Sequence, residues 1–151
     1  MNVLSLLKKD HEAVKDLFAK FERIGSRNSD RKWALLDDIR REVMVHAKVE
    51  EEIFYPAVKA FNGEGRKLIN AALKQHKEID DLLLQIARMN PADKKFDERF
   101  AALMDDVDNH IEEEEGQIFQ FAKENCPESQ LDEMGVEVEK RKSAIERQLA
   151  A

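Results

Sequence analysis

Apolar residues recur every three or four positions along most of the chain, which is the period of a helix that buries one stripe of side chains. The stripe predicts a first helix that ends at "GSRNSD" and a second from Trp33 to about Phe61. A third is closed by "MNP", and a fourth ends before "ENCPES". Pro56 lies inside the second predicted helix, where it removes a backbone donor, so we expect a kink or break near it.

The connections between these segments are short, which favours antiparallel neighbours. We therefore predict an all-α fold, an up-down-up-down four-helix bundle at about 3–125. A more charged stripe at about 128–149 predicts an additional C-terminal helix, with Ser129 and Asp132 as its capping pair. No linker divides the chain, so residues 1–151 are expected to form one domain.

The composition agrees with long amphipathic helices, since 38% of the residues are charged, 42% are hydrophobic, and only five are glycine and three proline. A chain of 151 residues buries a core that needs no structural metal, so any bound metal is expected to be functional. The net charge of -7 argues against nucleic acid as a partner.

The four histidines each fall on the apolar stripe of a different predicted helix. His76 follows His11 by 65 residues, and His110 follows His46 by 64. The surrounding sequences also repeat, "LKKDHEAVKDLFAKF" with "ALKQHKEIDDLLLQI" and "HAKVEEEIFYP" with "HIEEEEGQIFQ". Two helical hairpins related by a pseudo-two-fold axis would turn all four imidazoles toward one another.

A glutamate stands four residues after His46 and again after His110, which places acid and imidazole on one helix face, one turn apart. One such pair is common by chance, but four histidines in register with a repeated carboxylate favour a metal site. Imidazoles and carboxylates suit iron, and less exclusively manganese or zinc. Each carboxylate could bridge two ions that are held by separate histidine pairs. The predicted ligands are His11, His46, Glu50, His76, His110 and Glu114.

The acidic residues beside these ligands are expected to form a solvated flank. Those residues are Glu51, Glu52, Glu112 and Glu113. Glu115 remains an alternative to Glu114, because a slightly rotated helix would present it instead. Glu42 and Asp106 stand four residues before His46 and His110, which makes them candidates to accept the spare imidazole protons.

With these motifs the sequence resembles the hemerythrin family, in its HHE cation-binding branch, over about 3–125. The resemblance implies two non-haem iron ions, oxo- or hydroxo-bridged, that bind dioxygen or react with peroxide or related species, with catalase- or peroxidase-like turnover left open. Oxygen-carrying hemerythrins have a fifth histidine where this chain has Ala72. They take their fourth-helix carboxylate from an aspartate at the position of Glu115. These departures argue against simple reversible oxygen carriage.

Two other functions stay open: an iron-binding, iron-storing or iron-sensing module without turnover, and a helical adaptor with a vestigial metal site. The C-terminal helix could pack on its own bundle or join a second copy in a homo-oligomer. Cys126 is the single cysteine, which excludes an internal disulfide and fits a cytoplasmic protein. The first residues predict neither a signal peptide nor a membrane span.

Overall fold

The computed structural model describes residues 1–24 and 28–150. Every regular element in these residues is helical, which confirms the predicted all-α class. The elements are α1 (Val3–Ile24), α2 (Ser29–Val49), the π-helical turn η1 (Glu50–Phe54), α3 (Tyr55–Lys59), α4 (Gly63–Ala87), α5 (Lys94–Glu113), the π-helical turn η2 (Glu114–Ile118), α6 (Phe119–Asn125) and α7 (Glu128–Ala150). The predicted end of the first helix falls partly on residues 25–27, outside the described residues.

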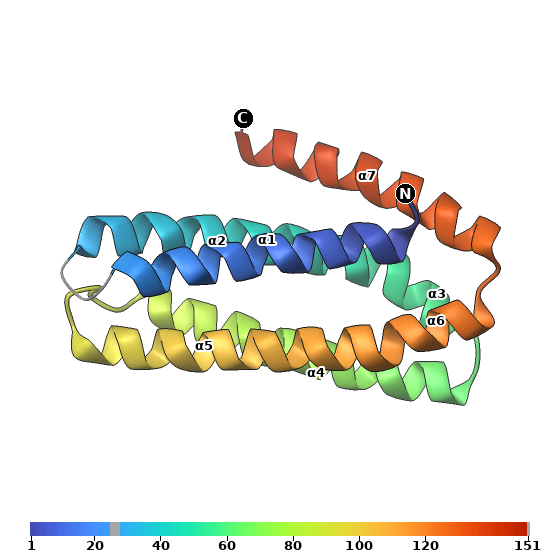
Figure 1. Cartoon of the computed structure of the whole chain (residues 1–151), viewed down its shortest axis with the longest axis horizontal. Coiled ribbons are helices and arrows are strands. Elements are labelled where there is room, and N and C mark those ends of the chain that lie inside the picture. Colours follow the sequence, from blue (N-terminus) through green and yellow to red (C-terminus); the bar gives the residue numbers. More distant parts are fainter. Residues whose placement is uncertain (25–27, 151) are drawn as a thin grey trace.

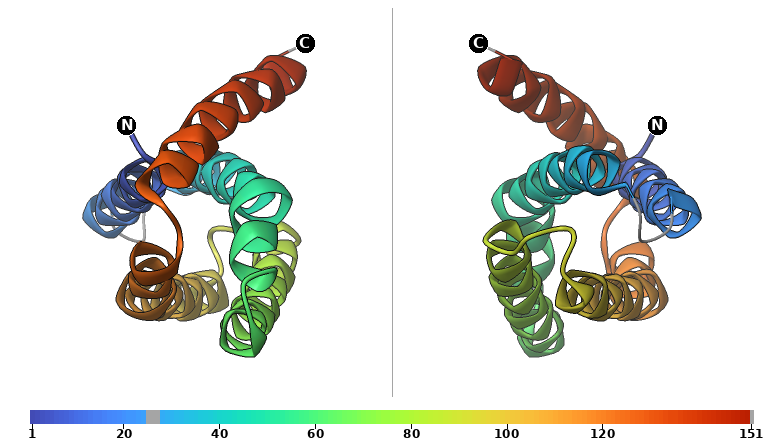
Figure 2. Two further views of the ribbon diagram at one scale, coloured as in Figure 1. Left: turned by 90° about the vertical axis from the view of Figure 1, so that its right-hand side faces the viewer. Right: turned by 90° about the vertical axis from the view of Figure 1, so that its left-hand side faces the viewer.

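Four helical rods run antiparallel in sequence order, as predicted (Figure 1). The rod α2–η1–α3 returns beside α1, and the rod α5–η2–α6 returns beside α4. Seen along the long axis, the four rods surround a common centre, and α7 crosses obliquely over α1 and α2 (Figure 2). The two hairpins predicted from the repeat are therefore the two halves of the bundle.

The interior consists of two apolar clusters with a polar layer between them. One cluster includes Leu7, Val49 and Ile118, near the end where α7 begins its packing, and the other includes Val14, Phe100 and Val107. In the second cluster the rings of Phe21 and Phe100 stack with centroids 3.6 Å apart. Each predicted histidine stands on its helix between residues of the two clusters, so the fold places the polar layer in the middle of a dry core.

The helix ends follow local capping chemistry. Asn62 Oδ1 accepts a hydrogen bond from Gly65 N at 3.0 Å at the start of α4, which supplies a partner for a free N–H group. The predicted capping pair of the C-terminal helix is wrong, because α7 begins at Glu128 and Ser129 lies inside it. Pro127 directly precedes the helix, and its carbonyl accepts a hydrogen bond from Leu131 N.

The second and fourth rods each contain one π-helical turn at the same place in the repeat. Tyr55 N donates to Glu50 O, and Phe119 N donates to Glu114 O, so each bond spans five residues. The predicted irregularity near Pro56 is therefore present, but Pro56 alone does not explain it, because Gln120 occupies the matching position of the fourth rod. Single π turns inside α-helices are frequent at functional sites.

Helix α7 packs on its own bundle, against α1, α2 and η1. A Cβ at Gly135 would collide with the Met1 carbonyl oxygen, so glycine allows the first residues of the chain to pass directly over α7. None of the described helices combines the length and the apolarity that a membrane crossing requires.

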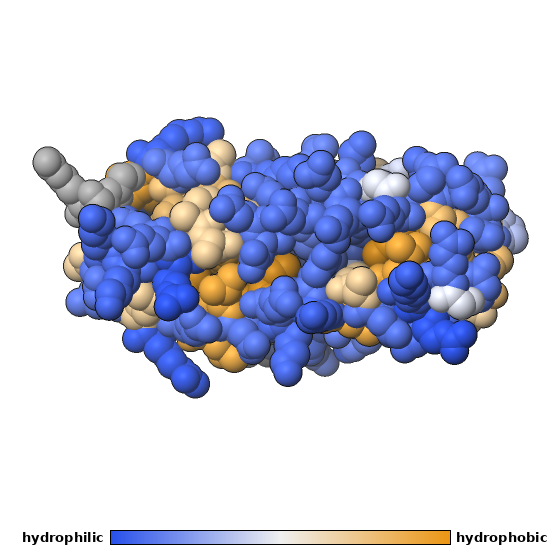
Figure 3. All heavy atoms as spheres, turned by 90° about the horizontal axis from the view of Figure 1, so that it is seen from below, coloured by the Kyte–Doolittle hydropathy of each residue, from blue (hydrophilic) through white to orange (hydrophobic). Residues whose placement is uncertain are grey.

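The face of the bundle opposite α7 is formed by α4 and α5. It is largely hydrophilic, with apolar groups visible along its middle (Figure 3).

Candidate metal centre

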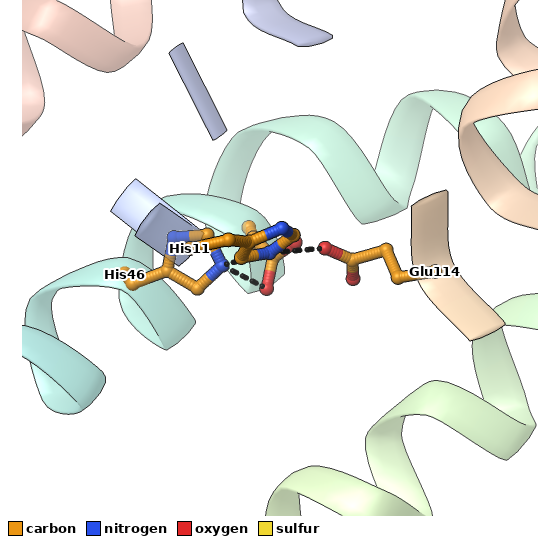
Figure 4. Close-up of side chains that lie close together, drawn as sticks. His11, His46 and Glu114 are labelled. Atoms are coloured by element: carbon orange, nitrogen blue, oxygen red, sulfur yellow. Dashed lines mark hydrogen bonds and ion pairs between the residues drawn. The ribbon is translucent and has the colours of Figure 1, made fainter. Parts of the chain in front are cut away.

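The structure brings all six predicted ligands into the polar layer. They form two groups that share their carboxylates, and within each group the donor atoms lie within 4.8 Å of one another. The first group is His11, His46, Glu50 and Glu114, and the second is Glu50, His76, His110 and Glu114. Figure 4 shows three members of the first group, with the rings of His11 and His46 close together and Glu114 approaching from another helix. The two carboxylates are thus common to two possible metal positions.

At the first position, the Nε2 atoms of His11 and His46 are 3.1 Å apart. Glu50 Oε1 lies 3.0 Å from His46 Nε2, and Glu114 Oε1 lies 3.0 Å from His11 Nε2. Both carboxylate residues have no exposed surface. The polar layer therefore presents nitrogen and oxygen donors at the separations of a shared cation.

The second position repeats this arrangement in the other half of the bundle. The Nε2 atoms of His76 and His110 are 3.1 Å apart. Glu50 Oε1 lies 3.3 Å from His76 Nε2, and Glu114 Oε2 lies 3.5 Å from His110 Nε2. Glu114 belongs to both groups and Glu115 to neither, so Glu114 is the better candidate of the two glutamates.

Each imidazole has a hydrogen-bond acceptor at its outer nitrogen, Nδ1. The Nδ1 atom of His11 lies 2.7 Å from Glu115, and that of His76 lies 2.9 Å from Glu51. Both bonds join opposite halves of the bundle. Glu51 was predicted to be only a solvated residue, and that prediction is wrong in part, since its side chain is 43% exposed but binds a histidine.

The other two outer nitrogens contact residues of their own half. His46 Nδ1 lies 3.0 Å from Asp10 Oδ2, and His110 Nδ1 lies 2.6 Å from Gln75 Oε1. The predictions of Glu42 and Asp106 for this role are wrong, because the acceptors come from the neighbouring helix rather than one turn away on the same helix. Asp10 and Gln75 share one signal in the sequence: each directly precedes the first histidine of its half.

These contacts test whether the residues fit a metal ion. The four Nδ1 acceptors are carboxylates or an amide oxygen, so Nδ1 carries the proton and Nε2 presents a lone pair. Two facing lone pairs repel each other unless a cation or an added proton lies between them. In addition, Glu50 Oε2 is buried without a hydrogen-bond partner, and the buried Glu114 Oε1 faces only His11 Nε2, at 3.0 Å. Converging lone pairs and unpartnered carboxylate oxygens are what a pair of bound cations would satisfy.

Tyr55 adds a hydroxyl to the second position that the spacing of the histidines did not reveal. Its Oη donates a hydrogen bond to Glu114 Oε2 and lies 3.2 Å from His76 Nε2 and 3.3 Å from Glu50 Oε1. Burial and the two carboxylates raise the pKa of this hydroxyl, so it is protonated without a metal. Phe119 occupies the matching place in the repeat, so only one position receives a hydroxyl.

The carboxylates draw protons to the histidines in the absence of a metal. Burial alone would lower the pKa of His76, but hydrogen bonds with Glu50 and Glu51 raise it to about 9. Burial also lowers the pKa of His46, but Glu50 and Asp10 outweigh burial and raise that pKa well above its usual value. Burial also opposes the hydrogen bonds that hold the pKa of Glu114 well below its usual range. In the metal-free protein, protons on the histidines therefore balance the charge of the buried carboxylates.

This proton uptake predicts how the stability of the metal-free protein depends on pH. Because the pKa of His76 rises from 6.5 to about 9 on folding, its contribution is complete below pH 6.5 and is lost as the pH rises through 9. The lowered pKa of Glu114 acts in the other direction and costs stability as the pH falls below 4.5. We expect the thermal midpoint, measured with a chelator present, to be highest between pH 4.5 and pH 6.5 and to fall toward pH 9.5. A level midpoint from pH 6.5 to 9.5 would contradict this expectation.

A cavity of about 30 Å³ adjoins the four histidines. Its other lining residues are Val14, Val43, Ala47, Ile79, Asp80, Val107 and Ile111. One water needs roughly 10–15 Å³ measured in this way, so the cavity holds roughly two atoms of that size. The space beside the candidate metal positions is therefore about the size of two water molecules.

Comparison with known proteins agrees with this geometry. Residues 2–122 match the profile of the Hemerythrin HHE cation binding domain. The chain is 29% identical over 149 residues to a protein of Nostoc sp. named DNA nickase, of whose length it spans 41%. It is 24% identical over 136 residues to the uncharacterized protein Rv2633c of Mycobacterium tuberculosis, of whose length it spans 81%.

A similar fold is present in a solved structure. The crystal structure of a Hemerythrin HHE cation binding domain-containing protein, the Rv2633c homolog from Mycobacterium kansasii, superposes with a TM-score of 0.81. The match covers 100% of this chain and 93% of the other, at 23% sequence identity. That likeness supports the bundle with its additional helix, including α7, which lies beyond the residues matched by the domain profile.

Proposed function

We propose, from the premise that this chain belongs to the Hemerythrin HHE cation binding domain family, that it holds two non-haem iron ions and handles a small oxidant. One observation carries the proposal: two buried carboxylates are shared by two histidine pairs beside a cavity of about 30 Å³. Other cations such as manganese or zinc would satisfy the same donors, but the mixture of imidazole and carboxylate suits iron best.

We propose that the ligands divide between the two ions in the way the sequence predicts. His11 and His46 would hold one ion, and His76 and His110 would hold the other. Glu50 and Glu114 would bind both, since each carboxylate belongs to both groups of donor atoms. An iron pair, when bound, supplies electrons to dioxygen or peroxide.

The chain's own residues control how that chemistry proceeds. The Nδ1 acceptors fix the orientation and the tautomer of each imidazole. The two apolar clusters on either side exclude bulk water from the polar layer. Tyr55 Oη can hold a proton directly beside both carboxylates, and the small cavity limits what approaches the histidines.

The test is metal content and optical response after anaerobic reconstitution with ferrous iron. Binding of two irons per chain, with a near-ultraviolet absorption band that changes when peroxide is added, supports the proposal. One labile iron that a chelator removes quickly, with no response to oxidants, favours an iron-sensing or iron-storing module instead. Failure to bind iron would contradict both functions and leave the adaptor.

Tyr55→Phe tests the hydroxyl that adjoins the second position. We propose that Tyr55 Oη supplies an oxygen donor where oxygen-carrying hemerythrins use a further histidine, because Oη lies 3.2 Å from His76 Nε2 and Ala72 stands one helical turn before His76. Phenylalanine fits the fold, as Phe119 does in the other half. We expect the variant to fold and bind two irons, but to lose any visible absorption from a phenolate bound to ferric iron. An identical visible spectrum in both proteins would exclude direct binding of Tyr55.

The prediction against nucleic acid remains a prediction. One relative is named DNA nickase, but this chain spans 41% of its length, and the net charge of -7 disfavours phosphate binding. Incubation of the iron-loaded protein with supercoiled plasmid tests the point. We expect the plasmid to stay supercoiled when oxidants are excluded, and nicking that a chelator abolishes would contradict that expectation.

A further inference from the structure

Helix α7 reaches the candidate metal centre through one side chain. Lys142 Nζ donates a hydrogen bond to Asp10 Oδ1, and the other oxygen of Asp10 accepts from His46 Nδ1 at 3.0 Å. The side chain of Asp10 is only 8% exposed, and that of Lys142 is 31% exposed. A continuous chain of three residues therefore runs from α7 to a histidine of the first metal position.

At the second metal position, the groups behind His110 carry different charges from those behind His46. His110 Nδ1 contacts the neutral amide of Gln75, whose Nε2 donates to the carboxylate of Glu113. In the first half a cation stands behind a carboxylate, whereas in the second half a carboxylate stands behind an amide. The repeat thus supplies two similar sets of ligands with different outer charges.

We propose that Lys142 sets the metal affinity of the first position, held by His11 and His46, by neutralising Asp10 behind His46. This inference rests on the proposed function, since it requires that the site bind cations. Lys142 contacts no ligand directly and acts through Asp10, so it is a positioning residue. It also lies beyond residues 2–122, which the domain profile matches, so α7 adds this control to the matched domain.

The direction of the effect follows from charge. A carboxylate at Nδ1 makes the imidazole a stronger donor and stabilises the bound cation. Lys142 cancels part of that negative charge. Removing the lysine leaves the charge of Asp10 unbalanced and should tighten metal binding, whereas removing the charge of Asp10 should weaken it. If Lys142 only anchored α7, its loss would not tighten binding.

Arg141 provides a matched control on the same helix. It binds Glu52 of η1 through two hydrogen bonds, at 2.7 and 3.2 Å. The side chain of Glu52 is 44% exposed. Arg141→Met therefore removes a neighbouring cation and an anchor of α7 without altering the residues behind His46.

The experiment is a titration of the metal-free full chain with Co²⁺, followed by visible absorption in competition with a chelator. For Lys142→Met we expect one of the two stepwise dissociation constants to fall about ten-fold, and for Asp10→Asn the same constant to rise about ten-fold. Lys142→Arg, which keeps the charge, should restore the unaltered value, and Arg141→Met should leave both constants unchanged. In the double variant of Asp10→Asn with Lys142→Met the constant should equal that of Asp10→Asn alone, because Lys142 acts through the charge of Asp10.

A second measurement locates the effect. In the Zn²⁺-loaded protein, the NMR signal of the His46 Nδ1 proton should move in Lys142→Met and stay in place in Arg141→Met. Weaker or unchanged cobalt binding by Lys142→Met would overturn the inference while leaving the proposed function intact. If the unaltered protein bound no cobalt and no iron, both would fail.

Discussion

His46→Ala and Glu114→Ala are each expected to abolish binding of a metal pair, whereas Glu52→Ala should bind as the unaltered protein does. Glu114 belongs to both donor groups, so its removal takes an oxygen from both positions. His46 supplies one of the two nitrogens of the first position, and its loss should leave at most one ion, at the second. Metal analysis of the reconstituted proteins measures the result as ions per chain.

The Glu52 variant is the control for this comparison. Glu52 lies in the same run of three glutamates as Glu50, two residues further along, but its carboxylate binds Arg141 at the surface. Equal losses in all three variants would mean that the inward face of η1 has been assigned wrongly. Full metal content in Glu114→Ala would show that another carboxylate replaces it, and Glu115 would be the first candidate.

Glu50→Gln is expected to lose the metal pair and yet to stabilise the metal-free protein at alkaline pH. The Glu50 side chain is fully buried, and one of its oxygens has no hydrogen-bond partner. Above pH 9 the proton on His76 is lost, so this buried charge keeps only His46 as a compensating imidazole. Replacing a buried ion pair by well-packed neutral groups is neutral or stabilises proteins by about 1–4 kcal/mol, and removing a poorly compensated buried charge should act in the same direction.

Urea unfolding at pH 9.5 and at pH 6, in the presence of a chelator, measures this effect. We expect a gain of about 2 kcal/mol at pH 9.5 and a smaller or reversed change at pH 6, where the protonated histidines pair with the carboxylates. Glu52→Gln should change the free energy of unfolding by less than about 0.5 kcal/mol at either pH. A loss of stability in Glu50→Gln at pH 9.5 would mean that the carboxylate contributes to folding without a metal. The expected gain would instead show that the buried charge is kept for binding.

The sequence by itself determined the bundle, the pairing of its two halves and the six residues that meet in the polar layer. These features follow from positions along single helices: residues three and four apart share a face, so the apolar stripe, the histidines and the glutamates one turn later are fixed by spacing. The duplication supplied the rest, because a repeat of 64 or 65 residues relates the two hairpins without any knowledge of their packing.

Only the tertiary structure decided what stands behind those ligands. Asp10, Gln75, Glu51 and Glu115 reach their histidines from other helices, and Tyr55 reaches the carboxylates because η1 changes the helical register. The contact between Lys142 and Asp10 joins residues 132 positions apart. Spacing along one helix carries no information about such contacts, since they depend on how two helices are rotated and offset when they pack. For that reason the set of candidate ligands was readable in the sequence, and the charges around it were not.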